Sequence, residues 1–162
     1  MAIVYFGLGS NIGDRLANLE AAMDALAGIA RIEARSRVYE TEPMHLADQP
    51  NFLNMAVRAR TDLEPLALLR AVKALEETLG RVETVRWGPR LIDIDILLYG
   101  DSVVDEDQLT IPHPRLAERR FALAPLADVG AGACHPLARR TVAELLASLP
   151  PTEDVRVIAG HV

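Results

Sequence analysis

The sequence contains a single cysteine, Cys134, among its 162 residues. It can form neither a disulfide framework nor a Cys-x-x-Cys metal or redox motif, so a reducing compartment is the natural setting. Basic residues are also scarce, since 17 Lys and Arg face 23 Asp and Glu and leave a net charge of −6. This negative charge argues against a protein that binds nucleic acid through its overall electrostatic field.

Long hydrophobic runs are absent as well. No apolar segment approaches the roughly 20 residues that a membrane-spanning helix needs. The apolar opening, residues 1–8, lacks a basic region and runs directly into Gly-Ser-Asn, which favours a buried strand over a signal peptide. We therefore expect a cytoplasmic protein without a membrane segment. With half of its residues hydrophobic, the chain is expected to form one domain over residues 1–162.

Hydrophobic periodicity predicts strands and helices in a definite order. We expect strands at residues 2–8, 32–39, 52–61 and 91–99, and helices at residues 15–26, 66–79, 121–126 and 141–149. Asp14 is expected to cap the first helix, Thr61 and Glu64 to form a capping box for the second, and Gly80 to end it. The first six elements follow the ferredoxin-like pattern, so the predicted fold is α+β, an antiparallel sheet with both helices on one face.

The strongest chemical signal is the acidic strand Asp93-Ile-Asp95. Successive side chains of a strand point to opposite faces, so Asp93 and Asp95 share one face and the neighbouring isoleucines share the other. Their Cα atoms lie about 7 Å apart, which is close enough for the two carboxylates to hold hard cations. Mg²⁺ typically combines carboxylates with water and substrate phosphates. The alternative is an ordinary half-exposed strand whose outer face happens to carry acids.

Arginines near this strand favour phosphate chemistry. Arg81, Arg86 and Arg90 precede it together with Trp87, the only tryptophan of the chain, and Arg119 and Arg120 follow later. Guanidinium groups fork onto phosphate oxygens, and an indole face can pack on adenine or on an arginine. Alternatively, these arginines are solvated loop charges and Trp87 is a core aromatic residue.

Two nucleotide-binding motifs are excluded. Residues 7–13 have the spacing Gly-x-Gly-x-x-x-Gly, whereas the dinucleotide fingerprint needs Gly-x-Gly-x-x-Gly in a parallel βαβ unit. The sequence also contains no Gly-x-x-x-x-Gly-Lys-Ser/Thr loop. Arginines and metal would therefore have to hold any nucleotide, and residues 7–13 are expected to form a tight turn from strand to helix.

Several segments together resemble the 6-hydroxymethyl-7,8-dihydropterin pyrophosphokinase family of folate biosynthesis. They are Gly-Ser-Asn-Ile-Gly-Asp at 9–14, Tyr-Glu-Thr-Glu-Pro at 39–43, Asp-Gln-Pro-Asn-Phe-Leu-Asn at 48–54, Arg-Trp-Gly-Pro-Arg-Leu-Ile-Asp-Ile-Asp-Ile at 86–96, Ile-Pro-His-Pro-Arg-Leu at 111–116 and Glu-Arg-Arg-Phe at 118–121. The 86–96 block is the most specific. The resemblance implies a ferredoxin-like enzyme that transfers pyrophosphate from ATP to a pterin alcohol.

The resemblance also implies roles for particular residues. It implies that Asp93 and Asp95 bind two Mg²⁺ ions and act in catalysis with Arg81 and Arg90. Nucleotide contacts are expected from Glu76, Arg81, Arg86, Trp87, Arg90, Ile96, Thr110, His113 and Arg119, with Arg86 and Trp87 on a loop that closes over the site. The pterin would stack between Phe52 and Phe121, with Asn54 and the backbone near Thr41 and Met44 reading its edge and Asp95 nearby.

Alternatives stay open at this point. Phe52 and Phe121 could be core aromatics, His113 a turn residue and Asn54 a strand-end cap. Two positions depart from the family pattern, because Glu83 replaces a common arginine and His45 a common glycine. The rival functions are a magnesium-dependent phosphohydrolase and a non-enzymatic regulatory module. A monomer that binds ATP and the pterin is the favoured expectation.

Overall fold

The computed structural model describes residues 1–42, 50–80, 91–150 and 155–159. The elements run in the order β1 (Ala2–Ser10), α1 (Arg15–Leu26), β2 (Arg31–Arg35), β3 (Val38–Thr41), β4 (Phe52–Thr61), α2 (Pro65–Thr78), β5 (Asp93–Tyr99), β6 (Val104–Asp105), β7 (Thr110–Ile111), a 3₁₀ turn (Leu116–Glu118), α3 (Arg120–Gly130), β8 (Cys134–His135), β9 (Arg140–Thr141), α4 (Val142–Ser148) and β10 (Val155–Ala159). The predicted α+β class is confirmed.

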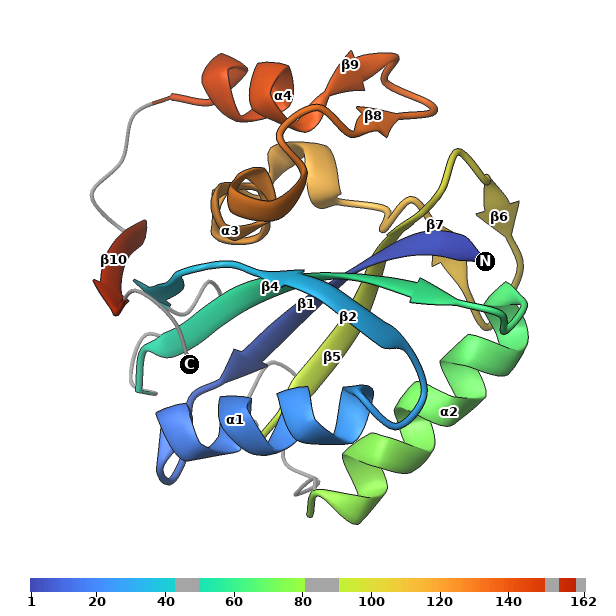
Figure 1. Ribbon diagram of the computed structural model, residues 1–162. Helices are drawn as coiled ribbons and strands as arrows, with labels where there is room; N and C mark the ends of the chain where they lie inside the picture. The colour runs from blue at the N-terminus through green and yellow to red at the C-terminus, as the bar shows by residue number, and fades with distance from the viewer. Residues whose placement is uncertain (43–49, 81–90, 151–154, 160–162) are drawn as a thin grey trace.

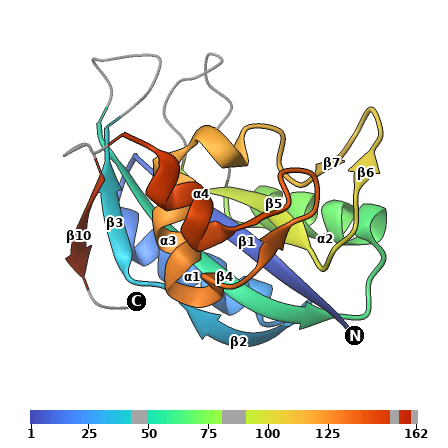
Figure 2. The same ribbon diagram turned by 90° about the horizontal axis from the view of Figure 1, so that it is seen from above.

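The main sheet is antiparallel, with the order β10-β3-β4-β1-β5 and β2 also paired to β4 (Figure 1). Viewed from above, β10 and β3 lie at one edge and β5 lies toward the other (Figure 2). With β2 and β3 taken as one interrupted strand, the order of the first strands is that of the predicted ferredoxin-like pattern. β1 lies between β4 and β5 and pairs with β4 along its whole length.

Helices cover both faces of this sheet (Figure 1). α1 and α2 lie on one face, as predicted, and enclose a core that includes Phe6, Leu8 and Met55. α3 and α4 lie on the other face, where a second core includes Leu97 and Leu123. The sequence indicated these two later helices but did not assign them to the second face.

Alternation along β1 serves both cores. Phe6 and Leu8 face α1 and α2, whereas Tyr5 faces α3 and is followed on that side by Gly7 and Gly9. A Cβ atom at Gly7 would lie 3.3 Å from Leu97 Cδ1, and one at Gly9 would lie 2.9 Å from Asn54 Oδ1. On the α3 side, the side chains of Leu97 and Asn54 therefore pack close to the β1 backbone at these two glycines.

Two local predictions were wrong. The strand expected at 32–39 is interrupted at Ser36, whose buried hydroxyl accepts a hydrogen bond from the Ala56 N–H at 2.8 Å. The Ser36 hydroxyl thus takes the place of a backbone carbonyl as the acceptor for the Ala56 N–H, and a new strand, β3, begins at Val38. The capping box of Thr61 and Glu64 does not form, because the Thr61 hydroxyl accepts from the Leu63 N–H and Glu64 makes no capping bond.

The other helix signals are confirmed. The Asp14 carboxylate accepts a hydrogen bond from the Ala17 N–H at 3.1 Å, as an N-cap residue does. Gly80 follows α2 with a φ of 83°, a left-handed conformation that glycine adopts without strain. Across the described residues, no helix has both the length and the apolar character that crossing a membrane requires.

Candidate functional site

The acidic pair lies on β5 as predicted. Ile92, Ile94 and Ile96 are buried in the core with α1 and α2, whereas Asp93 is half-buried and Asp95 is exposed on the opposite face. Their partners across the sheet are Gly9 for Asp93 and Gly7 for Asp95. The two carboxylates therefore lie beside Gly7 and Gly9, where β1 has no side chains on this face.

Asn54 lies on the far side of this glycine strip. Gly9 pairs with Asp93 on β5 and with Asn54 on β4, so these three residues form one row across the sheet. Neighbouring strands lie about 4.8 Å apart, which puts the backbones of Asp93 and Asn54 at roughly 10 Å from each other. The row therefore carries a carboxylate and an amide on one face of the sheet, with no side chain at Gly9 between them.

Neighbouring residues orient the Asn54 amide. Its Nδ2 donates to the hydroxyl of buried Thr41 at 2.6 Å, and its Oδ1 points toward Gly9. Phe52 lies beside it, with Cδ1 at 3.5 Å from the position of a Gly9 Cβ. A fixed amide oxygen and an aromatic ring therefore border the same strip.

The start of α3 brings a guanidinium to this side of the sheet. Arg119 precedes the helix, and its Cζ lies 5.4 Å from the centre of the Phe121 ring. Burial and Arg115 lower the pKa of Arg119, and the charge of Asp95 opposes that shift. Within the described part of the chain, the buried Arg119 Nε has no hydrogen-bond partner. An anion would be the natural group to complete its contacts.

His113 lies near this cation. Its backbone N–H donates to the Leu97 carbonyl of β5 at 3.0 Å, which ties it to the acidic strand. Burial, with the charges of Arg119 and Arg115, lowers its pKa to about 4. His113 is therefore a neutral imidazole at neutral pH and adds no charge to the site.

Three other predicted residues surround the strand differently. Glu76 is buried beneath β5, where its Oε2 accepts from the Ile94 N–H at 3.0 Å. Ile96 points into the core on the face opposite Asp95, so only its backbone is available to a nucleotide. Thr110 is exposed on β7, which packs beside β5.

Several predicted residues lie outside the described ranges. These are Met44, Arg81, Arg86, Trp87 and Arg90, together with the unusual residues His45 and Glu83. Arg120, by contrast, is described and lies away from the acidic pair. Its Nη2 donates to the Leu149 and Pro150 carbonyls at 3.0 and 2.8 Å, so it joins α3 to the end of α4.

The turn after β1 anchors the start of β4. The Asn11 amide donates to the Pro50 carbonyl at 3.1 Å, and Arg15 donates to the Asn51 carbonyl at 2.9 Å and to Glu40 at 3.0 Å. These residues, with Ile12 and Gly13, line a hollow of about 500 Å³. Its ionic groups contact one another, so the turn positions the chain just ahead of Phe52.

The carboxylate pair fits a magnesium ion that completes its shell with phosphate and water. Over the described residues no group of three or more His, Cys, Asp or Glu side chains forms a metal cage. Mg²⁺ needs no such cage, because it is typically held by one or two carboxylates together with substrate phosphates. Asp93 and Asp95 are the residues that would hold it.

Gly7 and Gly9 are the site residues whose role the sequence interpretation missed. Both lie inside a strand, where glycine weakens pairing and often marks the close approach of another group. The sequence Phe-Gly-Leu-Gly at 6–9 carries that signal. It was masked by the turn signal of residues 7–13, which covers the same letters.

We expect His113 to titrate far below an ordinary histidine. The pKa falls from 6.5 to about 4 on folding, so between these values the unfolded chain binds a proton that the native protein does not. Stability should therefore fall as the pH drops from 6.5 toward 4 and level off below.

NMR titration of the His113 ring measures this pKa directly, and the variant His113→Gln should lose less stability than the wild type over the same pH range. A midpoint between pH 6 and 7 would contradict the burial of the neutral ring.

Comparison with known proteins places this chain in a family. Residues 5–131 match the sequence pattern of 7,8-dihydro-6-hydroxymethylpterin-pyrophosphokinase (HPPK). The 2-amino-4-hydroxy-6-hydroxymethyldihydropteridine pyrophosphokinase of Aquifex aeolicus is 44% identical over 144 residues, 89% of this chain and 90% of the relative. The Bacillus subtilis protein of the same name is 47% identical over 129 residues, 78% of this chain and 77% of the relative.

Longer proteins contain a similar part. The mitochondrial folate synthesis bifunctional protein of Pisum sativum is 49% identical over 128 residues, which are 78% of this chain and 25% of the plant protein. The crystal structure of Plasmodium falciparum HPPK-DHPS with STZ-DHP superposes with a TM-score of 0.74 at 18% identity, over 90% of this chain and 43% of that one. That likeness concerns the fold alone. The family match and the identities to the two bacterial enzymes show that the chain belongs to the 7,8-dihydro-6-hydroxymethylpterin-pyrophosphokinase family.

Proposed function

We propose that the chain transfers the pyrophosphoryl group of ATP to the hydroxymethyl oxygen of 6-hydroxymethyl-7,8-dihydropterin and releases AMP, a step of folate biosynthesis. Family membership supports the reaction. The observation that carries its assignment to this surface is the row Asp93–Gly9–Asn54. It joins an acidic pair suited to metal-bound phosphates to an oriented amide suited to a heterocycle.

The transfer makes one bond and breaks another. The hydroxymethyl oxygen attacks the β-phosphorus, the bond from that phosphorus to the oxygen bridging it to the α-phosphate breaks, and AMP leaves with the bridging oxygen. The hydroxyl proton is lost to solvent or a nearby base. Positioning and charge neutralisation carry most of the catalysis in such reactions.

The phosphate half of the site is assigned to β5 and the start of α3. Asp93 and Asp95 would hold magnesium, which when bound supplies positive charge to the phosphate oxygens and stabilises the transition state. Arg119 would bind a phosphate oxygen, since its buried Nε has no hydrogen-bond partner among the described residues. His113, being neutral, would donate a hydrogen bond without adding charge.

The pterin half is assigned to the opposite end of the glycine strip. Asn54 Oδ1 would accept a hydrogen bond from the ring edge, because its Nδ2 is already engaged by Thr41. Phe52 and Phe121 offer aromatic faces, and offset stacking suits a flat heterocycle. Gly9 lets the ring approach the sheet closely.

The remaining assignments stay predictions. They concern Glu76, Ile96 and Thr110 beside β5, and Met44, Arg81, Arg86, Trp87 and Arg90 outside the described ranges. The binding of two magnesium ions rather than one, a monomeric state and a cytoplasmic location also stay predictions.

The decisive experiment measures AMP release from Mg-ATP in three parallel reactions. One contains 6-hydroxymethyl-7,8-dihydropterin, one contains the 6-methyl analogue that lacks the hydroxyl, and one contains no pterin. AMP should form only with the alcohol, and mass analysis should find a diphosphate on it. AMP or ADP in all three would indicate a phosphohydrolase, and no turnover would indicate a binding module.

The variant Asp95→Asn tests the metal assignment. It keeps the size of the side chain but removes a charge from the pair, so kcat should fall by two or more orders of magnitude, because metal-borne charge stabilisation contributes several kcal/mol. Circular dichroism should show a native fold. As a control, Asp105→Asn on β6 removes a charge from an exposed strand outside the row. An unchanged rate in folded Asp95→Asn would exclude Asp95 as a metal ligand.

The variant Gly9→Ala tests the glycine strip. Its new methyl group would lie 2.9 Å from Asn54 Oδ1 and must displace the amide. We expect pterin affinity to fall about tenfold, as for the loss of one hydrogen bond to an oriented group, with little change in affinity for an ATP analogue. Calorimetry measures both. Gly132→Ala is the matched control, because its Cβ meets no atom within 4 Å. Equal losses for both ligands would contradict the division of the site.

A further inference from the structure

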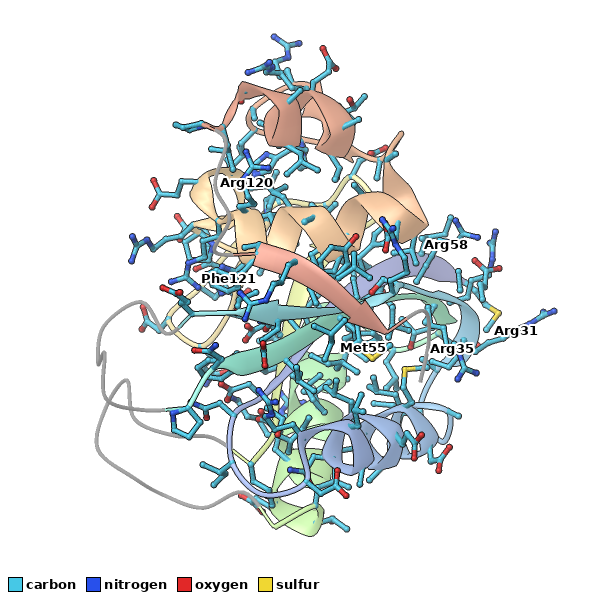
Figure 3. The ribbon with its side chains drawn as sticks, turned by 90° about the vertical axis from the view of Figure 1, so that its left-hand side faces the viewer. Arg31, Arg35, Met55, Arg58, Arg120 and Phe121 are labelled. Atoms are coloured by element: carbon cyan, nitrogen blue, oxygen red, sulfur yellow. The ribbon has the colours of Figure 1, made fainter. Side chains whose placement is uncertain are left out.

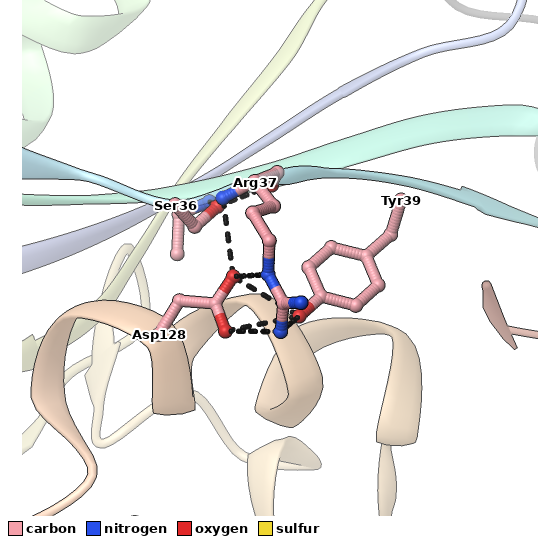
Figure 4. A network of polar contacts seen from close by, with 5 residues as sticks. Ser36, Arg37, Tyr39 and Asp128 are labelled. Carbon is pink, nitrogen blue, oxygen red and sulfur yellow. Dashed lines mark hydrogen bonds and ion pairs between the residues drawn. The ribbon is translucent and has the colours of Figure 1, made fainter. Parts of the chain in front are cut away.

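A polar cluster joins the start of β3 to α3 and contains none of the residues assigned above (Figure 4). Asp128 on α3 accepts hydrogen bonds from the Arg37 backbone N–H at 3.1 Å and from Arg37 Nε and Nη2 at 3.0 Å each. The Tyr39 hydroxyl lies 3.0 Å from both oxygens of the same carboxylate and accepts from Arg37 Nη2 at 2.9 Å. One carboxylate therefore holds Tyr39 of β3 and Arg37, which directly precedes this strand.

The cluster is partly shielded from solvent, with Tyr39 buried and the Arg37 side chain half exposed. Tyr39 is 6% exposed and the Asp128 side chain is 18% exposed. Burial alone would raise the pKa of Asp128, but the hydrogen bonds and charge of Arg37 and Tyr39 outweigh it and hold that pKa below its usual value. Burial and Asp128 raise the pKa of Tyr39. The phenol thus stays a donor and the carboxylate an acceptor at neutral pH.

The helix and the strand that the cluster joins both carry or contact residues of the proposed pterin pocket. Asp128 follows Phe121 by seven residues on α3, which is close to two helical turns and places both on one face of the helix. On the sheet, Tyr39 pairs directly with Asn54, and Thr41 on the same strand accepts the hydrogen bond that orients the Asn54 amide. The cluster is thus a polar link between the helix that bears Phe121 and the strand that pairs with Asn54.

We propose that Tyr39, Arg37 and Asp128 are positioning residues for the pterin: they set the separation between Phe121 and Asn54 without touching the substrate. The inference rests on the proposed function. β3 is short, pairs with the edge strand β10 and with β4, and packs against α3 on one face. Loss of the link lets the two walls of the pocket separate.

A second anchor of α3 supplies a matched control. Arg58 Nη1 on β4 donates to the Val129 carbonyl at 2.8 Å. Figure 3 shows Arg58 and Phe121 at opposite ends of the space between α3 and the sheet. Arg58 therefore stabilises the same helix against the same sheet, but it lies four residues beyond Asn54 on β4 and its hydrogen bond and ion pair go to Val129 and Glu33.

The test compares Tyr39→Phe, which removes only the hydroxyl, with Arg58→Gln. Wild-type AMP formation from the pterin is measured first, and its absence would defeat the proposed function. Pterin affinity is then measured by calorimetry with a non-transferable ATP analogue and magnesium, alongside kcat and the KM of each substrate. Tyr39→Phe should weaken pterin binding about tenfold, as for loss of a hydrogen bond to a charged partner. Its kcat and KM for ATP should change less than about twofold.

Arg58→Gln should lose stability in urea without losing pterin affinity. A double-mutant cycle of Tyr39→Phe with Asp128→Asn should show the double variant to be little worse than either single one. If Tyr39→Phe does not fold, Arg37→Gln replaces it in the same comparison, because the Arg37 side chain is half exposed. Unchanged pterin affinity in the folded cluster variant, or an equal loss in Arg58→Gln, would overturn the positioning role.

Discussion

The absence of side chains at Gly7 and Gly9 is the constraint on which the site depends. Both lie on β1, with the α1 and α2 core packed beneath them and β4 and β5 on either side. A methyl group at Gly9 would collide with the Asn54 amide. The face of β1 toward α3 therefore carries no side chain at Gly7 or Gly9, between an acidic pair on β5 and an oriented amide on β4.

The sheet has a hydrophobic core on each face, and the two cores have different roles. The core under α1 and α2 takes Phe6 of β1 and both Ile94 and Ile96 of β5. It supports β5 from below, and buried Glu76 accepts from the Ile94 backbone N–H, which fixes the strand between the two aspartates. The core under α3 and α4 brings Arg119 and Phe121 to the other face. Rigid support and ligand contact are thus separated by the sheet itself.

The charges of this acidic chain are arranged locally. Glu40 lies between Arg15 and Arg156, which hold its pKa below the usual value despite burial and which connect α1, β3 and β10. Arg119, by contrast, is partly buried beside a ring and opposite an acidic strand. Because most other described ion pairs lie on the surface, where each contributes little, Arg119 and the aspartates stand out as the groups suited to a phosphate ligand.

The sequence by itself determined the features that depend on local pattern. Alternation along β5 separates Asp93 and Asp95 from the isoleucines, and the caps at Asp14 and Gly80 follow from short-range hydrogen bonds and backbone freedom. Local signals failed where a distant residue supplied the partner: the Ser36 hydroxyl satisfies Ala56, and the strand breaks there. Tertiary structure alone decided that Gly9 separates Asp93 from Asn54 and that Asp128 meets Tyr39, 89 residues away. Such pairs arise when strands and helices pack, and no spacing along the chain encodes them.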